Sequence, residues 1–289
     1  MNTLQDAVIA WYRTHARDLP WRTPGTTAWE VLLSEVMSQQ TPVARVIPIW
    51  EQWRQRWPTP AHFADAGRDE VLRAWGRLGY PRRALRLHEC AAEIVERFEG
   101  TVPAEVEELL SLPGIGEYTA RAVACFHYGK NVPVVDTNVR RVYRRAIEGH
   151  FLAGTASKKE LGHVAALLPE IDGPTFSVGL MELGALVCTA ASPDCPRCPL
   201  LSRCAWQKAG CPQPSEEDKK RRRTQKYEGT DRHARGTIMA LLRNTPTSVP
   251  MAQIDAAWPD AAQRSRALFG LLDDGLAEQL DDGTFRLPR

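Results

Sequence analysis

The chain of 289 residues is long enough for one large domain or two smaller ones with a buried core. Its composition is 43% hydrophobic and 25% charged, and no stretch approaches the roughly 20 apolar residues of a membrane helix. The net charge of +2 does not by itself indicate a nucleic-acid partner, and the N-terminus lacks the pattern of a secretory signal. We therefore expect a cytoplasmic protein.

The first two thirds of the sequence predict helices. From Leu4 to about Ala209, apolar residues recur at helical spacing, and Pro or Gly interrupts the pattern at distances typical of globular helices. One such apolar stripe consists of Trp29, Leu32, Leu33, Val36 and Met37. Because no alternating strand pattern occurs there, we expect an all-α body.

The segment after Cys211 is polar and charged, as linkers are. Within it, Lys219–Lys226 (KKRRRTQK) contains six basic residues and no acidic one. This run is either a solvated linker or a contact with DNA phosphates.

The C-terminal residues predict a small module. Helical patterns at 237–243, 251–257 and 261–274 precede two short alternating runs around Asp282-Gly283, which is a strong hairpin turn. Three helices and a terminal hairpin resemble a winged helix. A packing appendage that never touches DNA is an equal alternative.

A glycine-rich turn lies near the middle of the chain. Leu112–Gly116 (LPGIG) precedes a helix that opens with Glu117-Tyr118-Thr119. Glycines permit a tight turn, and the free N–H groups at a helix start suit a phosphate oxygen. The stretch predicts a helix–hairpin–helix element, although a plain turn between two helices also fits.

The seven cysteines indicate metal rather than disulfides, because their number is odd and five of them fall between 188 and 211. The pattern Cys188-x6-Cys195-x2-Cys198-x5-Cys204 suits either an iron–sulfur cluster or zinc. Structural zinc usually has two Cys-x-x-Cys pairs, and only one is present. The remaining three are interpreted as a spare thiol, Cys211, and two core residues, Cys90 and Cys125.

Two carboxylates stand beside apolar residues. Glu35 flanks an apolar helical stripe, where a glutamate is most often exposed. Asp136 precedes a helix in the position of an N-cap, and the helix dipole should keep it ionised. Taken alone, neither residue indicates catalysis.

Several motifs in order give the sequence a family resemblance. From about Trp11 to Cys204 it resembles the adenine DNA glycosylase branch of the helix–hairpin–helix glycosylases, in the endonuclease III superfamily. The matching stretches are LPWR at 19–22, LLSEVMSQQTPVARVIP at 32–48, LPGIGEYTARAV at 112–123, VVDTNVRRV at 134–142, MELGALVC at 181–188 and the cysteine loop.

The resemblance implies catalytic roles. Glu35 falls on the family's catalytic glutamate, and in a dry pocket its pKa should rise so that it can protonate adenine N7. Asp136 would stabilise the cationic sugar, and Asn138 would orient that site. Tyr118 replaces the lysine with which bifunctional relatives form a Schiff base, so hydrolysis with little or no strand cleavage is expected.

The resemblance also implies a base pocket. Leu19, Trp21 and Arg22 would wall the flipped base, and Glu182 would accept a hydrogen bond from the adenine amine. Core packing for Trp21 and a surface charge for Glu182 are the alternatives. The gap left by the base would be filled by Gln39 and Gln40.

Backbone and cofactor contacts follow from the same matches. The DNA backbone would meet Gly114, Gly116 and Thr119, and the four spaced cysteines, Cys188, Cys195, Cys198 and Cys204, would hold a [4Fe–4S] cluster. Arginines on the helix after Asp136 would help to hold the backbone, with a solvated face equally open for the outer two; these are Arg140, Arg141, Arg144 and Arg145.

Three departures from the family pattern are visible. Pro81 replaces a second tyrosine that intercalates in many members, a role that Tyr80 or Arg82 could take, and Ser38 replaces a leucine. The C-terminal residues are too few for the 8-oxoguanine-recognition domain of many members. We expect the basic linker and the module to replace it as DNA contacts.

We therefore expect a two-lobed monomer that acts on double-stranded DNA with an A:8-oxoguanine or A:G mispair, in the cytoplasm at the nucleoid. A glycosylase at 1–214 would comprise a six-helix lobe at about 23–131 and a cluster lobe of 1–22 plus 132–214, with the active site between them. A linker at 215–229 and the module at 230–289 would follow.

The main alternative is a thymine/uracil mismatch glycosylase, in which Tyr118 also occurs. A bifunctional glycosylase for oxidised pyrimidines is disfavoured by Tyr118, and a non-catalytic DNA binder by the presence of both Glu35 and Asp136.

Overall fold

The computed structural model describes residues 3–214 and 227–289. Within them the chain is mostly helical, as expected, and none of its helices is both long and apolar enough to cross a membrane. The basic run Lys219–Lys226 and residues 215–226 of the expected linker lie outside the described part. Two compact units form, described separately below: Met1–Glu35, Ala104–Ser111 and Ile115–Arg223 make the first, and Val36–Pro103, Leu112–Gly114 and Thr224–Arg289 the second.

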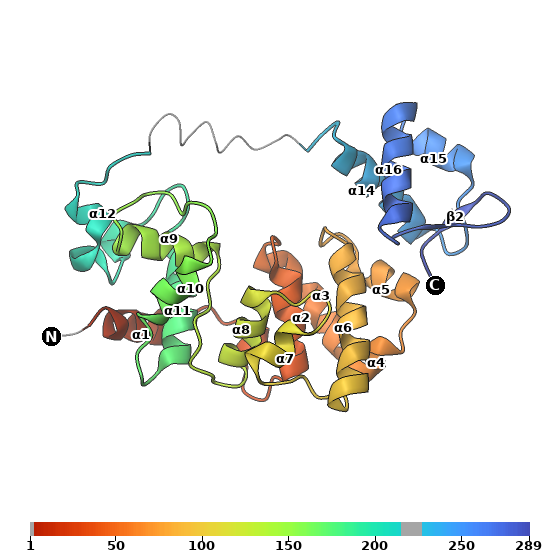
Figure 1. The fold of residues 1–289 in the computed structure, drawn as a ribbon. Helices are drawn as coiled ribbons and strands as arrows, with labels where there is room; N and C mark the ends of the chain where they lie inside the picture. Colours follow the sequence, from red (N-terminus) through yellow and green to blue (C-terminus); the bar gives the residue numbers. More distant parts are fainter. Residues whose placement is uncertain (1–2, 215–226) are drawn as a thin grey trace. The chain divides into compact units, whose positions relative to one another are not determined.

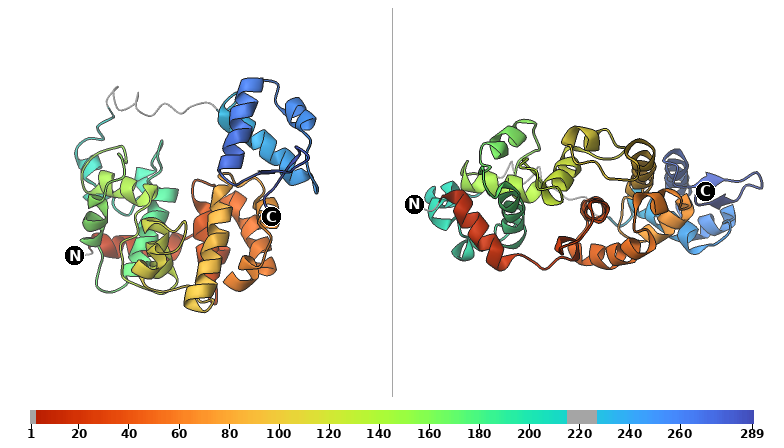
Figure 2. Two further views of the ribbon diagram at one scale, coloured as in Figure 1. Left: turned by 45° about the vertical axis from the view of Figure 1, so that its right-hand side comes forward. Right: turned by 90° about the horizontal axis from the view of Figure 1, so that it is seen from below.

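Three helices form the centre of the first unit. α1 (Leu4–His15), α9 (Thr137–Ala146) and α11 (Gly173–Leu186) pack around buried side chains that include Val8, Val139, Phe176 and Leu183. α1 lies beside α11 (Figures 1 and 2). The unit also contains most of α2 (Ala28–Ser38), η1 (Pro20–Arg22), α7 (Val106–Leu110), α8 (Glu117–Phe126), α10 (Lys159–Ala165), η2 (Cys195–Arg197), η3 (Leu201–Arg203) and α12 (Ala205–Lys208).

A glycine brings α9 and α11 into close contact. A Cβ atom added to Gly184 on α11 would lie 2.7 Å from both the Cβ and the carbonyl oxygen of Asn138. No real side chain tolerates that approach, so only glycine fits. As a result, α11 passes directly against the first turn of α9, next to Asp136.

The second unit has an aromatic core. Trp50 and Trp53 on α3 (Val43–Arg56), Phe63 on α4 (Pro60–Ala64) and Trp75 at the end of α5 (Arg68–Trp75) are fully buried. The ring of Trp53 lies 5.1 Å from that of Phe63 and 5.6 Å from that of Trp75, centroid to centroid. Tilted and edge-on pairs of this kind stabilise a core beyond the area they bury. α4 and α5 both pack on α6 (Arg82–Phe98).

The C-terminal module has the elements of a winged helix. α14 (Asp231–Asn244), α15 (Met251–Ala257) and α16 (Ala261–Asp273) precede a hairpin of β1 (Glu278–Gln279) and β2 (Phe285–Arg286). Val249 pairs with Phe285 through an isolated antiparallel β-bridge. The turn predicted at Asp282-Gly283 is confirmed. The predicted start of the first helix at 237 was wrong, because Thr230 accepts a hydrogen bond from the His233 N–H and begins α14 earlier.

The module contacts α5 through α14, within the same unit. The guanidinium of Arg73 donates to three carbonyl oxygens at the end of α14, those of Leu242, Arg243 and Thr245, the last at 2.9 Å. The C-terminal end of a helix carries partial negative charge, so a cation there is favourable. This contact makes one packed body of the module and the helices that precede the glycine-rich turn.

Candidate active site and cysteine loop

Glu35 is a buried carboxyl, not a surface one. It lies on α2 with only 8% of its surface exposed, and its Oε2 accepts a hydrogen bond of 2.7 Å from the hydroxyl of Tyr118 on α8. Burial raises the pKa of Glu35 to about 7. The hydrogen bond from Tyr118 and the charge of Arg22 oppose that rise, and the charge of Asp136 adds to it. The expected rise in pKa is therefore present before any base is bound.

Tyr118 is a hydrogen-bond donor at this site. Burial and the charges of Glu35 and Asp136 keep its pKa well above its ordinary value of 10.0. The phenol therefore stays protonated and donates to the Glu35 carboxyl, and the sulfur of Met181 lies 4.0 Å from its oxygen. Its role is to hold and partly solvate the carboxyl that it touches.

Asp136 is the N-cap of α9, as predicted. Its Oδ1 accepts from the Val139 N–H and its Oδ2 from the Asn138 side-chain amide, both at 2.7 Å. The N–H groups at the helix start favour ionisation, as predicted, but burial acts against them. Burial raises the pKa of Asp136, although the bonds from Val139 and Asn138 and the charge of Arg141 oppose the rise. More hydrogen-bond donors lower the pKa of Asp136 than lower the pKa of Glu35. Asp136 is therefore the stronger acid of the two.

Arg141 orients the amide of Asn138, a contact that the sequence analysis missed. Its Nη2 donates to Asn138 Oδ1 at 2.7 Å and to the Gly184 carbonyl at 2.6 Å, and its Nε donates to the Cys188 carbonyl at 2.6 Å. Only one face of the Asn138 amide can then point to Asp136. A chain of hydrogen bonds thus runs from the Asp136 carboxylate through Asn138 and Arg141 to the first cysteine of the loop.

The arginines of α9 do not lie free for DNA contact. Arg141 is 6% and Arg145 is 1% exposed, and both donate to groups inside the unit, so the expectation of a backbone contact was wrong for them. Arg140 and Arg144 form ion pairs with Glu160 and Glu148. The alternation of two buried with two paired arginines follows the period of the helix.

Glu182 is fully buried, so the surface-charge alternative was wrong. On α11 its two oxygens accept from Arg17 (backbone N–H at 3.0 Å, Nε at 2.7 Å and Nη2 at 2.9 Å) and from Arg22 Nη2 at 3.0 Å. Burial would raise the pKa of Glu182, but these donors outweigh it and hold the pKa at about 2. Arg17, two residues before the LPWR motif, was not singled out in the sequence. Leu19 is buried and Trp21 is half-buried in η1.

The expected backbone-contact residues differ in exposure. Gly114 has a φ of +75°, and a Cβ there would lie 2.7 Å from the Cβ of Arg86, so glycine is required. Gly116 is the N-cap of α8 and has no side chain to occupy the free N–H groups. Thr119 is 2% exposed, so its side chain does not reach the surface.

Gln39 and Gln40 follow α2 in the second unit. Gln40 has a φ of +53°, and the carbonyl oxygen of Gln39 accepts from Arg83 at 2.7 Å. Arg83, also missed in the sequence, donates to the carbonyls of Val36 at 2.7 Å and Gly79 at 3.1 Å as well. The guanidinium of Arg83 therefore joins the backbone at Gln39 to the turn that precedes Tyr80.

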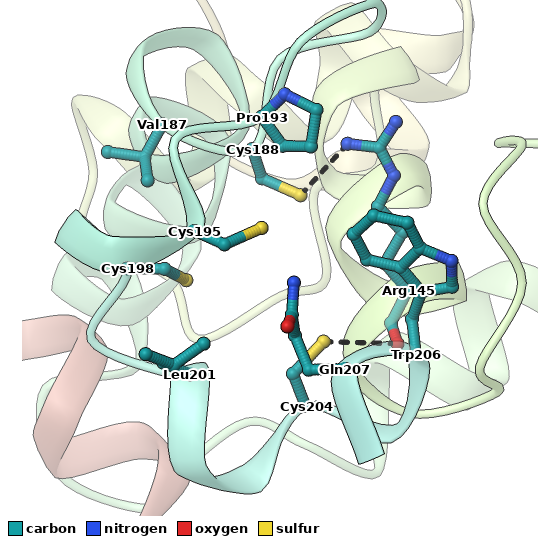
Figure 3. A pocket seen from close by; sticks show the side chains of 10 residues that line it. All are labelled: Arg145, Val187, Cys188, Pro193, Cys195, Cys198, Leu201, Cys204, Trp206 and Gln207. Carbon is teal, nitrogen blue, oxygen red and sulfur yellow. Dashed lines mark hydrogen bonds between the residues drawn. The ribbon is translucent and has the colours of Figure 1, made fainter. Parts of the chain in front are cut away.

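The four spaced cysteines line one pocket, together with Arg145 and Trp206 among others. Figure 3 shows their sulfur atoms directed toward a shared space. Arg145 Nη1 lies 3.4 Å from the Cys188 sulfur and also donates to the Thr189 carbonyl, so a buried cation holds the loop at its start. Cys90 and Cys125 are buried in the core, as predicted. Cys211 is partly buried and packs against the hydrophobic core of the first unit.

The architecture and this site define a class of DNA repair protein. Residues 33–161 match the family model of the HhH-GPD superfamily base excision DNA repair proteins. A solved structure described as a thermostable thymine-DNA glycosylase covers 71% of this chain and 95% of its own, at a TM-score of 0.65 and 26% identity.

Two curated relatives are closer in sequence. An adenine DNA glycosylase of Mycolicibacterium smegmatis is 57% identical over 97% of this chain and 94% of its own length. One of Mycobacterium tuberculosis is 54% identical over 97% of this chain and 92% of its own. The chain belongs to the adenine DNA glycosylase family. The sequence match to these two relatives covers 97% of this chain, so it includes the C-terminal module as well as residues 33–161.

We predict that Glu35→Gln stabilises the protein more as pH rises. Below its ordinary pKa of 4.5, Glu35 is protonated in the folded and unfolded chain alike. Above its folded pKa of about 7 it is ionised in both, and burying that charge lowers the free energy of unfolding by about 3 kcal/mol. Urea unfolding of variant and parent at about pH 4.5 and pH 8.5 measures this difference.

Glu182→Gln is the matched control. The pKa of Glu182 is lowered to about 2, so ionised Glu182 stabilises the fold, and its replacement should destabilise the protein across both conditions. A Glu35→Gln effect that is the same at the two pH values would contradict the assignment of the raised pKa.

Proposed function

We propose that the protein hydrolyses the N-glycosidic bond of adenine mispaired with 8-oxoguanine or guanine in double-stranded DNA. The observation that carries this proposal is the pair of carboxyls, Glu35 and Asp136, whose surroundings separate their acidities. Glycosidic hydrolysis near neutral pH needs one carboxyl that can give a proton and one that is an anion. This pair offers both.

Glu35, protonated up to about pH 7, gives its proton to N7 of the extruded base. The bond from the base to the sugar then breaks, the electron pair leaves with the base, and the sugar becomes an oxocarbenium cation. Asp136 supplies the negative charge that stabilises this cation. Water adds to the cationic carbon, and Glu35, now a carboxylate, accepts the proton that the water releases.

Tyr118 supports a purely hydrolytic outcome. A phenol has no amine with which to form an imine with the sugar, so the route to strand cleavage through a Schiff base is closed. Its hydrogen bond to Glu35 has a different consequence. By favouring the ionised carboxyl, it lowers the pKa of Glu35 against the effect of burial, and the resulting pKa is about 7.

The clamp of Arg17, Arg22 and Glu182 supports adenine as the base. It combines guanidinium donors with a carboxylate acceptor, and the Watson–Crick and Hoogsteen edges of adenine combine an amine donor with ring-nitrogen acceptors. Both oxygens of Glu182 already accept from these arginines, so the adenine amine would take the place of one guanidinium donor, whereas a thymine carbonyl has no hydrogen to donate. Thymine or uracil excision remains the second candidate, because a thymine-DNA glycosylase shares the fold at 26% identity.

A glycosylase at 1–214, with lobes at about 23–131 and at 1–22 plus 132–214, would act as a monomer at the nucleoid, and a linker at 215–229 would join it to the module at 230–289. Leu19 and Trp21 would wall the base, Gln39 and Gln40 would fill the gap it leaves, and Gly114 and Gly116 would contact the DNA backbone.

A single-turnover assay tests the proposed reaction. We expect the protein to release adenine from A:8-oxoguanine and A:G duplexes at least about 100-fold faster than thymine or uracil from T:G or U:G duplexes, since a pocket that pairs polar groups discriminates at that level or better. Strand breaks should appear only after alkali treatment. Faster release of thymine or uracil would instead establish the second candidate.

The cysteine loop is proposed to hold a [4Fe–4S] cluster. Tetrahedral zinc with Zn–S bonds of about 2.3 Å would place the sulfurs about 3.8 Å apart. No three Cys, His, Asp or Glu side chains of residues 3–214 and 227–289 lie close enough together to bind a single metal ion. A cluster separates its thiolates more widely, because iron and sulfide atoms lie between them. Four cysteines around one pocket therefore fit the cluster, which would cross-link the loop.

Metal content tests this assignment. We expect about four iron atoms per chain and a brown colour from the thiolate–iron absorption, because cysteine thiolates bind such clusters. Cys198→Ser should lose most of the iron, whereas Cys211→Ser, outside the pocket, should keep it. One zinc ion per chain, or equal iron loss in both variants, would contradict the cluster.

A further inference from the structure

A groove lies between the module and the turn that joins α5 to α6, and residues of the second unit alone line it. One wall runs from Trp75 to Arg82, and the other is α14 with Tyr227 before it. The groove contains about 1660 Å³, including its open mouth, which is far more than one ion needs. The contact of Arg73 with the end of α14 holds the two walls together, so the groove is formed without a ligand.

The groove is strongly basic. Five arginines line it: Arg77, Arg82, Arg232, Arg235 and Arg243. Asp274 is the one carboxylate among the described lining residues. It lies between Arg82, at 2.9 Å, and Arg235, and so offsets part of two charges while joining the walls.

Within residues 3–214 and 227–289, no ion pair joins the other three arginines to a carboxylate, unlike Arg82 and Arg235. Arg243 is half-buried, and burial and the charge of Arg77 lower its pKa. Arg232 lies over the ring of Tyr227, 5.8 Å from its centroid. Holding like charges together in a partly dry hollow costs free energy, which an anion in the groove would offset.

Two exposed aromatic rings stand in the same groove. Tyr80 is 51% and Tyr227 is 49% exposed. Tyr80 also has a φ of +47°, which is unusual for a residue with a side chain, and its backbone is held by the Arg83 bonds to the preceding turn. Exposed aromatic rings beside arginines suit the sugars and bases of a nucleic-acid strand as well as its phosphates.

We propose that this groove binds the sugar–phosphate backbone of the DNA substrate, with Arg77, Arg232 and Arg243 contacting phosphates. The inference rests on the proposed function, which makes DNA the substrate. It assigns to the winged-helix-like module a part in DNA binding, which α14 shares with the turn between α5 and α6. Phosphate binding through arginines is independent of sequence and is weakened by salt.

The test uses the full chain with the Glu35→Gln change, so that mispaired duplex is bound without being cleaved. Fluorescence anisotropy over a range of salt concentrations gives the affinity and its salt dependence. For Arg77→Gln with Arg232→Gln, both exposed positions, we expect about 30-fold weaker binding at low salt and a salt slope smaller by about two. Arg243→Gln alone should lower the slope by about one.

Arg266→Gln is the matched control, because Arg266 is on α16 of the same module, is paired with Asp231 and does not line the groove. It should leave affinity and slope unchanged. Unaltered affinity and slope in the groove variants, with the fold intact by circular dichroism, would overturn the inference. An equal loss in Arg266→Gln would overturn it as well, since the effect would then be one of general charge.

Failure of the groove and failure of the proposed function give different results. If the parent releases adenine while groove variants bind normally, the groove assignment falls and the function stands. If the parent releases no base but the groove variants lose affinity and slope on duplex, the groove assignment stands and the proposed reaction falls.

Discussion

The burial of the Glu35 carboxyl is the constraint on which the site depends. Burial of this α2 side chain disfavours its charged form and raises its pKa. The Tyr118 hydroxyl and the charge of Arg22 oppose burial and bring the pKa to about 7, where an acid can both give and recover a proton. Asp136, served by two strong donors, is the more acidic partner.

α9 connects this chemistry to the cysteine loop. Its first residue follows Asp136, Arg141 on its next turn fixes Asn138 and reaches the Cys188 carbonyl, and Arg145 one turn later holds the loop at Thr189. The close approach at Gly184 lets α11 supply acceptors to the same arginine. Folding of the loop and placement of the carboxylate are therefore coupled through one helix.

Periodicity and turn signals predicted the helical body, the three module helices and the hairpin, because these depend on local patterns. The same patterns missed Arg17, Arg83 and the inward role of Arg141. Each of these arginines acts on groups far away in sequence, such as Glu182, 165 positions from Arg17, and no spacing rule reports such a contact. The burial of Glu182 and the net direction of the Asp136 pKa also depend on tertiary packing.

The central claim is that Glu35 carries a proton near neutral pH while Asp136 does not. Infrared spectroscopy measures this directly, because a protonated carboxyl has a carbonyl stretch that a carboxylate lacks. The difference spectrum between the parent and Glu35→Gln should show this band at pH 6. As the pH is raised, the band should disappear with a titration midpoint at about pH 7. A midpoint near 4.5, the ordinary value for glutamate, would contradict the account.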